Sequence, residues 1–479
     1  MIKKITLLFL STSFLLGDTL PLEKNQLSST KASYDGNALI LQGRVQLDHG
    51  LGNMCADQAF LQKQETGKDF PFSLIQLKKE VLLSLKNKAE LRCNLAELDF
   101  NDLKGTLSAE EQETVSYKDF LKKEGDLLIP FYLVSQLIDL QFSKKEIPSE
   151  ASQYEIQSLV ARKKVQIDYA KEFILHADEA SYHNSGIVQA YPTSEKSRCK
   201  LSYQGENIES ELIQINTKTS QLQIQNPIGA IPSQLFTQSQ ISPLSFRCGN
   251  LFWDHEKEIL ILKDHVSIQE KVLGTLFAEK EIRIEQGSRK EKKFVKTVHI
   301  DGVSRLEHED PSSGWMHKIS CFGSLHIAGD KGLITLTSPP QIEKQLCYQD
   351  LDVILHADKA SIEYEDSSDY KPLSLTLQGN VTIKSTNGPF RQGLADRLTY
   401  SPDTQTVILS ALPKKRVLFR DEEQNLNMSA QEIHLTKDPS TQKMQAKGIG
   451  NVKFLLSIEE SDLLKNRFFP ASEEPKNAS

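Results

Sequence analysis

The pattern of apolar and polar positions along this chain is that of short β-strands, and it repeats. In residues 39–47, Leu-Ile-Leu-Gln-Gly-Arg-Val-Gln-Leu, apolar and polar side chains alternate around a central glycine. Such alternation predicts a half-buried strand with one apolar face. The phrase returns at 375–383, with Gly379 in the place of Gly43, and at 260–268, with Asp264 there. The chain is therefore expected to be built by repetition.

A second strand motif follows the first along the chain. Its centre is an alanine followed by an acid or an amide, with apolar residues on alternate positions. The copies of this Ala-acid step are Ala56-Asp57, Ala177-Asp178, Ala278-Glu279, Ala357-Asp358, Ala395-Asp396 and Ala430-Gln431. Two strands joined by a short glycine-containing turn predict a hairpin unit. We expect the alanine to point inward and the acid to lie on a solvated outer face, with no chemical role.

Residues 105–165 depart from the alternation. Ser108-Ala-Glu-Glu has the spacing of a helix capping box, and residues 127–142 form an apolar run. This region is predicted to be a partly helical insertion that packs in the protein's own core. A docking element for a membrane or a partner is the alternative.

The N-terminus resembles an export signal. Met-Ile-Lys-Lys precedes an apolar run from Ile5 to Leu16, which is shorter than the roughly 20 residues needed to span a bilayer. A cleaved signal peptide is expected, with an uncleaved membrane anchor as the alternative. The predicted organisation is a signal peptide at 1–17, an N-terminal β module at 18–104, the insertion at 105–165, a degenerate β-repeat module at 166–345, a C-terminal β module at 346–456 and a flexible tail at 457–479.

Composition narrows the classes of function. The 479 residues carry a net charge of −7 and are 38% apolar, so there is no basic stripe for nucleic acid, and thin β layers fit better than one large core. Serine-hydrolase, zinc-protease and phosphate-loop motifs are absent, and His176 and His356 belong to repeats. We therefore expect no enzyme, metal or cofactor. The cysteines have no Cys-x-x-Cys spacing and are either disulfide-bonded or small buried residues: Cys55, Cys93, Cys199, Cys248, Cys321 and Cys347.

The alternating strand with Gln-Gly-x-Val, the short turn and the Ala-Asp step together resemble the OstA-like, or LptA, family of periplasmic lipopolysaccharide-transport proteins. The match is best at 32–61 and 353–454. The resemblance implies an elongated, folded-over β-jellyroll of repeated antiparallel strands, V-shaped in section. It also implies a periplasmic location and an apolar groove for the acyl chains of lipopolysaccharide or its lipid moiety. Other Lpt-type components, or further copies of the chain, would pair head to tail through 32–61 and 440–454.

The predicted groove is the apolar face of the three nine-residue phrases. Its residues are Leu39, Leu41, Val45, Leu47, Leu260, Leu262, Val266, Ile268, Leu375, Leu377, Val381 and Ile383. Each acyl methylene buried there would contribute about 0.8 kcal/mol, and the contact is non-directional, so a chain could slide. The glycines either limit bulk on this face or mark a bend. The alternatives are an exported structural β-solenoid scaffold with self-packed faces, and a lipid- or glycan-modifying enzyme on a β scaffold.

Overall fold

The computed structural model describes residues 27–63, 72–122, 128–145, 153–194, 196–231, 243–270, 274–289, 292–309, 314–365, 372–437 and 444–455. Across these residues the secondary structure consists of antiparallel β-strands and two short 3-10 turns, Gly329–Lys331 and Ile342–Lys344, with no α-helix. The predicted all-β antiparallel fold is therefore confirmed. The predicted signal peptide and C-terminal tail lie outside the described residues.

The chain divides into two compact units. Unit 1 comprises Met1–Phe120 and Tyr132–Lys163, and unit 2 comprises Leu121–Phe131 and Lys164–Ser479. The strands of unit 1 are β1 Leu27–Ser28, β2 Lys31–Tyr34, β3 Ala38–His49, β4 Gly52–Lys63, β5 Phe72–Leu85, β6 Glu90–Asp99, β7 Lys104–Ser108 and β10 Leu137–Lys145. Three strands contain residues of both units: β8 Val115–Lys122, β9 Leu128–Ser135 and β11 Gln153–Tyr169.

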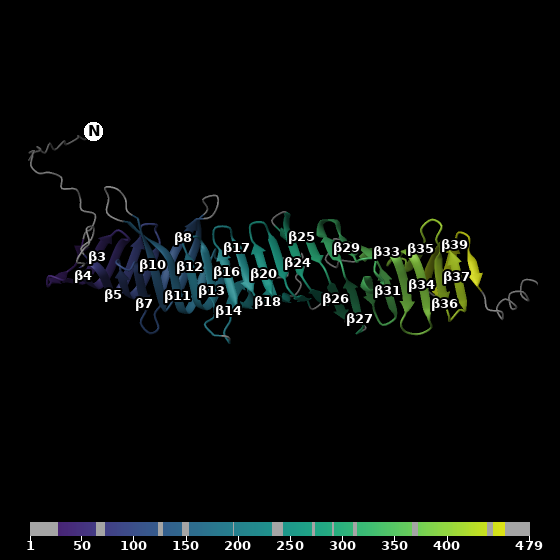
Figure 1. The fold of residues 1–479 in the computed structure, drawn as a ribbon, viewed down its shortest axis with the longest axis horizontal. Helices are drawn as coiled ribbons and strands as arrows, with labels where there is room; N and C mark the ends of the chain where they lie inside the picture. The colour runs from purple at the N-terminus through teal and green to yellow at the C-terminus, as the bar shows by residue number, and fades with distance from the viewer. Residues whose placement is uncertain are drawn as a thin grey trace, which may run out of the picture. The chain divides into compact units, whose positions relative to one another are not determined.

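Unit 2 holds the remaining strands, which follow one another from blue to yellow in Figure 1. They are β12 Phe173–His183, β13 Ile187–Tyr191, β14 Cys199–Tyr203, β15 Glu206–Ser210, β16 Leu212–Asn216, β17 Gln221–Gln225, β18 Ile228–Ile231, β19 Leu244–Arg247, β20 Asn250–Asp254, β21 Ile259–Lys263, β22 Val266–Glu270, β23 Gly274–Ala278, β24 Glu281–Arg289, β25 Lys292–Asp301, β26 Ser304–Glu309, β27 Met316–Cys321, β28 Ser324–Ala328, β29 Leu333–Thr337, β30 Leu346–Gln349, β31 Val353–Ala357, β32 Lys359–Tyr364, β33 Pro372–Ser385, β34 Arg391–Ser401, β35 Thr406–Ser410, β36 Val417–Asp421, β37 Leu426–Ala430, β38 Glu432–Lys437, β39 Met444–Ile449 and β40 Lys453–Leu455.

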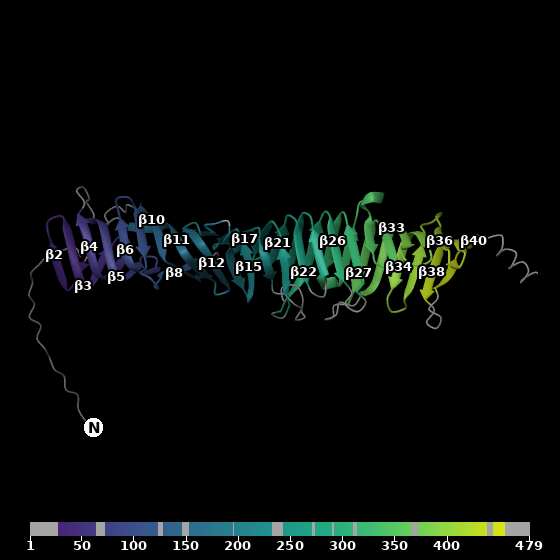
Figure 2. The same ribbon diagram turned by 90° about the horizontal axis from the view of Figure 1, so that it is seen from below.

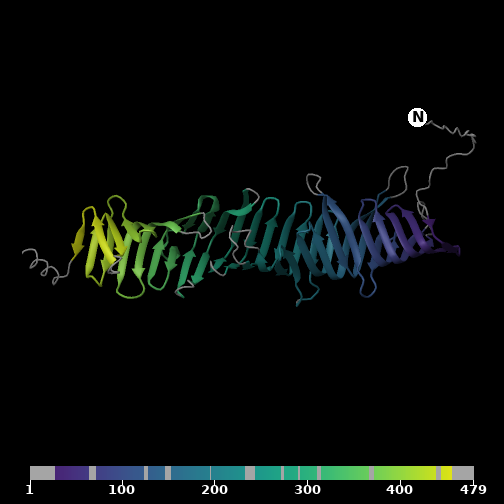
Figure 3. The same cartoon turned by 180° about the vertical axis from the view of Figure 1, so that it is seen from behind.

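In unit 2 the chain alternates between two ladders of paired strands, which we name wall A and wall B. Wall A contains β13, β16, β17, β20, β21, β24, β25, β28, β29, β32, β35, β38 and β39. Wall B contains β14, β15, β18, β19, β22, β23, β26, β27, β30, β31, β36, β37 and β40. Strands β12, β33 and β34 give one half to each wall. Figures 2 and 3 show these strands from below and from behind.

The chain passes between the walls at sharp corners in the backbone. In β33 the corner is Gly379-Asn380, where two successive residues have positive φ (77° and 46°) and the pairing register shifts. Asp264-His265, between β21 and β22, has the same left-handed pair, and so does Gly43-Arg44 in β3 of unit 1. The nine-residue phrase therefore encodes a corner, and its glycine marks the bend. In unit 2 the first half of each phrase lies in wall A and the second half in wall B.

The Ala-acid steps mark the corners of neighbouring strands. The Asp358 N–H donates to the carbonyl oxygens of Gln378 and Gly379 at 3.2 and 3.0 Å. Its carboxylate accepts hydrogen bonds from Gln345 Nε2 and Asn380 Nδ2 at 3.0 and 2.8 Å. The acid therefore ties adjacent corners together, which is a more specific structural role than the solvated face predicted from the sequence.

Two other acids of this motif make equivalent bonds. Asp178 accepts hydrogen bonds from Ser197 Oγ and the Thr193 N–H, which hold its pKa below the usual value. Asp396 accepts from Lys415 Nζ and the Leu412 N–H, with the same effect on its pKa. Because these bonds form only in the folded protein, the acids stabilise it above the pH range in which carboxylates titrate.

The predicted helical insertion at 105–165 is wrong, because the described part of this region is β-strand. It comprises β7 to β11, with Ile129, Phe131 and Leu133 buried on one face of β9. The long apolar run arose because β9 and β10 are joined through Gln136 alone, with no polar turn between them. Ser108, taken for a helix cap, is the last residue of β7, and a turn follows it in which the Glu113 N–H donates to the Glu110 carbonyl. The predicted module borders near 104 and 345 fall within runs of paired strands.

The six cysteines are free thiols. Burial raises the pKa of Cys93, Cys199 and Cys248 to about 12, so these thiols remain protonated. The structure therefore supports the interpretation of cysteines as small apolar residues rather than disulfides.

A buried histidine supports the interior of unit 1. The His49 ring lies 4.2 Å from that of Phe100 and 5.1 Å from that of Tyr154, and its Nδ1 accepts a hydrogen bond from the Leu51 N–H. Burial, together with the charge of Lys86, lowers the pKa of His49 to about 3. The native state therefore keeps this imidazole neutral where the unfolded chain protonates it.

We predict that the free energy of unfolding of unit 1 decreases as the pH falls from 6.5. The folded-state pKa is depressed, so the stabilisation is complete above the unfolded value of about 6.5 and is lost as the pH falls toward 3. At pH 5 the loss is about 2 kcal/mol. Urea titrations at pH 7 and pH 5 measure it, and His49→Phe should remove most of the difference. An unchanged pH dependence in that variant would contradict the assignment.

We predict that Gly379→Ala destabilises unit 2 more than Gly388→Ala. Both glycines have φ near +75°, so both alanines meet the left-handed penalty of about 1–2 kcal/mol. A Cβ at Gly379 would lie 2.4 Å from Asp358 Oδ2, whereas one at Gly388 meets no atom within 4 Å. Thermal unfolding of the two variants compares the costs, and equal losses would show that the corner is not crowded.

Candidate functional site

One row of side chains runs along the inner face of wall B, from strand to strand in direct cross-strand register. The row is Leu175, Leu201, Ile208, Gly229, Phe246, Ile268, Leu276, Leu306, Ile319, Tyr348, Leu355, Ile383, Gly393, Phe419, Met428 and Phe454. Directly opposed side chains on one face of a sheet contact each other, so the row is a continuous apolar strip. It forms the first half of the candidate site.

The burial of this strip changes along its length. Side chains from Leu175 to Phe246 are buried, and so are Phe419 and Met428 near the other end. The seven side chains of the strip from Ile268 to Ile383, both of these included, are all partly exposed. These residues share a face with fully buried ones, such as Val266 and Val381, so it is the inner face that reaches solvent here.

Wall A carries a matching strip away from the corners. It runs Val188, Ile215, Leu222, Trp253, Leu260, Ile284, Val298, Ile327, Ile334, Ile362, Leu375, Tyr400, Val407 and Leu435. It is buried up to Ile284 and again at Leu435, and partly exposed from Val298 to Val407. The exposed parts of the two strips overlap along the chain. We name this part of unit 2, residues 268–407, the open section.

The interior of the open section remains closed on the side of the corners. Leu336, Leu377 and Leu398 of wall A are buried there. On wall B the positions beside the corners carry small residues, including Ala278, Cys321 and Ala357, all buried. Small side chains fit where the two walls converge, and larger ones line the interior farther out. The interior therefore has a packed apolar floor and accessible apolar sides, with Ile319, Leu355 and Leu375 packed against the core as partly buried residues.

The twelve sequence-predicted groove residues all carry side chains on inner faces, but they differ in access. Eight are buried: Leu41, Val45, Leu47, Leu260, Leu262, Val266, Leu377 and Val381. The other four are partly exposed: Leu39, Ile268, Leu375 and Ile383. The last three of these belong to the open section. That any of the twelve contacts lipid remains a prediction.

Several residues of the open section are not identified by the sequence motifs. Leu276, Leu306, Ile319 and Leu355 lie in short strands that lack the Gln-Gly phrase. Their signals are alternation over five or six residues and, for Leu276 and Leu355, the Ala-acid step that follows, and these identify a strand without telling how far its inner face is covered. Cross-strand register, rather than motif, brings them together.

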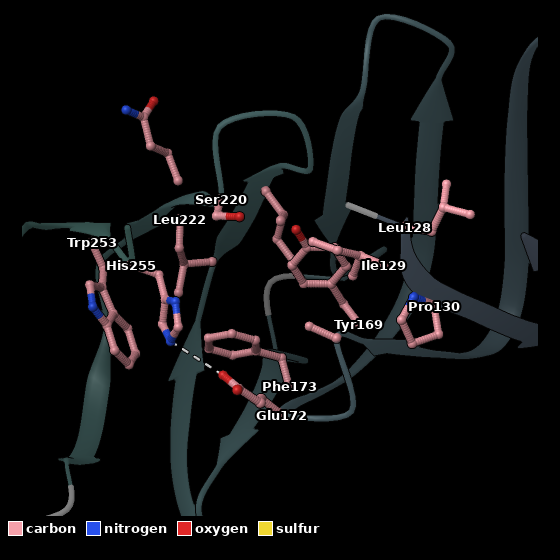
Figure 4. A pocket seen from close by; sticks show the side chains of 13 residues that line it. Leu128, Ile129, Pro130, Tyr169, Glu172, Phe173, Ser220, Leu222, Trp253 and His255 are labelled. Carbon is pink, nitrogen blue, oxygen red and sulfur yellow. Dashed lines mark ion pairs between the residues drawn. The ribbon is translucent and has the colours of Figure 1, made fainter. Parts of the chain in front are cut away.

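A separate cavity lies in unit 2 outside the open section. It has a volume of about 330 Å³ and is lined by Leu128, Ile129, Pro130, Tyr169, Ala170, Glu172, Phe173, Ile215, Ser220, Gln221, Leu222, Trp253 and His255. Figure 4 shows the rings of Phe173, His255 and Trp253 on one side and Tyr169 with Ile129 on the other. Three lining residues, Ile215, Leu222 and Trp253, belong to the apolar strip of wall A. The cavity is therefore part of the same interior.

The polar groups of this cavity are few. Glu172 and His255 form an ion pair at 3.3 Å, drawn in Figure 4. Behind them Tyr203 packs against Phe173 and Trp253, with centroids 4.9 and 4.7 Å apart, and burial, reinforced by the Glu172 charge, raises the Tyr203 pKa to about 12. An aromatic wall with one ion pair suits an apolar ligand better than a polar one.

The described part of the chain contains neither a metal site nor a membrane-spanning helix. No group of three or more histidine, cysteine, aspartate or glutamate side chains is placed to hold a metal ion there. Within the same residues, no helix has the length and apolar character needed to cross a bilayer.

Comparisons with known proteins find only weak structural similarities. No protein-family model and no curated protein sequence matches the chain. Its fold is similar to the crystal structure of LptH, "the LptA homologous periplasmic component of the conserved lipopolysaccharide transport device from Pseudomonas aeruginosa", with TM-score 0.23 and 7% identity over 29% of this chain and 94% of that chain. The extracellular domain of a hybrid two component system from B. thetaiotaomicron matches with TM-score 0.11 and 10% identity over 90% of this chain and 72% of that chain. Similarities this weak carry no argument about function.

We predict that truncation of a side chain costs more stability in the packed part of the interior than in the open section. Leu262→Ala removes a fully buried side chain and should cost about 2–5 kcal/mol of unfolding free energy. Ile383→Ala removes a partly exposed one and should cost less than half as much, because less contact is lost. Chemical denaturation of both variants measures the difference. Equal costs would show that the interior at Ile383 is packed shut.

Proposed function

We propose that the protein binds the acyl chains of a lipid of the lipopolysaccharide type in its open section. In this role it would carry or bridge that lipid across the periplasm in transport to the outer membrane. The observation that supports the proposal is the coincidence of two partly exposed apolar strips on facing walls, above a closed floor. A contiguous exposed apolar surface in a soluble fold commonly marks a binding site.

The dimensions of the open section suit acyl chains. On wall B the strip crosses seven strands from β22 to β33. At roughly 4.8 Å between strands it spans about 30 Å. This is about the thickness of the hydrocarbon core of a bilayer, which corresponds to two lipid acyl chains placed end to end. Chains lying along the strip would cover side chains that water contacts otherwise.

The ends of the strand ladders support the bridging part of the proposal. Among the described residues, β2 pairs only with β3, and β39 pairs only with β38. Each presents an edge to which a further strand can add. Within 32–61 the available edge is that of β2, because β3 and β4 are paired on both sides. Strand addition at these edges, the periplasmic location and the identity of the partners rest on the motif resemblance.

We predict that a photoreactive residue at Ile383 captures the co-purified lipid. The Ile383 side chain faces the accessible interior, whereas its neighbour Lys384 points outward and Leu262 is fully buried in wall A outside the open section. Crosslinking in cells followed by mass spectrometry of the adduct gives the readout. Positions 384 and 262 are the matched controls and should capture none.

Capture at 384 alone, or native protein that carries no lipid, would favour the alternative of a structural β-solenoid scaffold. The buried strips from β12 to β21, apart from the cavity at Phe173 and Trp253, are what that alternative predicts for the whole chain. Mass spectrometry of lipids retained by the purified protein decides between the two.

A further inference from the structure

Three stacked rings stand at the rim of the open section. His308 of β26 pairs directly with His317 of β27, and their rings lie 6.0 Å apart at 22°. The ring of Tyr348 on β30 lies 6.2 Å from that of His317 at 23°. His308 and His317 are two positions beyond Leu306 and Ile319, so they share the inner face with the apolar strip. Tyr348 is itself a member of the strip.

Two linked hydrogen bonds determine where the phenol proton of Tyr348 and the ring proton of His317 lie. Tyr348 Oη donates to Asp350 Oδ2 at 2.8 Å, and His317 Nδ1 lies 2.9 Å from Tyr348 Oη. An ionised carboxylate only accepts, so the phenol proton points to Asp350. The Asp350 carboxylate is itself held by the N–H groups of Asp352 and Val353 at 2.8 and 2.7 Å.

The tautomer of His317 follows from this arrangement. With its single proton given to Asp350, the Tyr348 oxygen can only accept, so His317 Nδ1 carries the hydrogen. In the neutral imidazole the other nitrogen, Nε2, is then an acceptor. Among the described residues His317 makes no further hydrogen bond, and its side chain is partly exposed. Burial, followed by the bond to Asp350, raises the pKa of Tyr348, which keeps the phenol protonated.

We propose that His308, His317 and Tyr348 form a headgroup site, in which His317 Nε2 accepts a hydrogen bond from a hydroxyl group of the bound amphiphile. The inference rests on the proposed function, because the apolar strip at Leu306, Ile319 and Leu355 would hold the chain attached to that headgroup. Amphipathic rings suit this position, with an apolar body against the chain and a polar tip in water. The acceptor selects a donor such as a sugar or glycerol hydroxyl over an acceptor-only phosphate or ester.

The charges around the site favour contact with a hydroxyl group of the headgroup rather than with a phosphate. Asp350 faces His317 through Tyr348, and His308 is the other titratable neighbour on the inner face. The flanking Glu307 and Lys318 alternate to the outer face, where they approach each other at 4.0 Å. No fixed cation among the described residues pairs with the rings, so an anionic headgroup has no partner beyond the imidazoles.

The test compares octyl glucoside with its fully O-methylated analogue, both as monomers, by calorimetric titration of the full-length protein. The two probes share chain and ring and differ in hydroxyl donors. The native protein should bind octyl glucoside several-fold more tightly, since one hydrogen bond corresponds to about 2- to 10-fold. His317→Phe, which keeps a stacking ring, should reduce that preference to near unity. His176→Phe, an exposed histidine on the outer face of wall B, is the control and should leave it unchanged.

The outcomes separate the two proposals. Equal affinity of native protein for both probes, or a preference that survives in His317→Phe, would overturn the headgroup site while leaving the binding of acyl chains intact. If neither probe binds, the proposed function is overturned, and the headgroup site with it.

Discussion

The constraint on which this structure depends is that its inner apolar faces converge at a row of backbone corners. Where the chain turns from wall A into wall B, at corners such as Gly379-Asn380 and Asp264-His265, it needs residues in the left-handed region, and where it returns from wall B the side chain before the corner is small. Glycine, asparagine and aspartate meet the first need at Gly379-Asn380 and Asp264. Alanine and cysteine meet the second at Ala357 and Cys321. The acid of the Ala-acid step then ties one corner to the next through hydrogen bonds such as those of Asp358.

Because the walls diverge from these corners, the side chains that line the walls decide how much of the interior is filled. From β12 to β21, and again near β36 and β37, aromatic and large aliphatic side chains such as Phe246 and Phe419 are buried in it, apart from the cavity lined by Trp253. In the open section the same positions carry Ile268, Leu276 and Leu355, which leave the outer part of the interior accessible. One fold thus serves as a packed core in some sections and as an accessible surface in another. The sections differ in how far the side chains of the strip are buried.

Much of the fold could be predicted from the sequence, because two-residue alternation is a local signal. The strands around 39–61 and 353–454 and the pairing of the Gln-Gly phrase with the Ala-acid step were expected. The helix predicted at 105–165 failed because two strands joined without a polar turn look like one long apolar segment. The open section could not be predicted, since access depends on which side chains face each other across register. His308, His317 and Tyr348 lie on three strands and carry no common motif.

The alternation between the walls also limits how such a chain can change in length. From β13 onward it visits the walls in the order A, B, B, A, A, so that four strands complete one cycle. Removing two strands would place the next strand in the wrong wall, whereas removing four would leave every later strand in its original wall. Successive cycles begin at Leu212, Asn250 and Glu281, which are 38 and 31 residues apart. Insertions and deletions within the ladder are therefore expected in whole cycles of four strands, which is roughly 31 to 38 residues. The open section could lengthen or shorten during evolution only by such cycles.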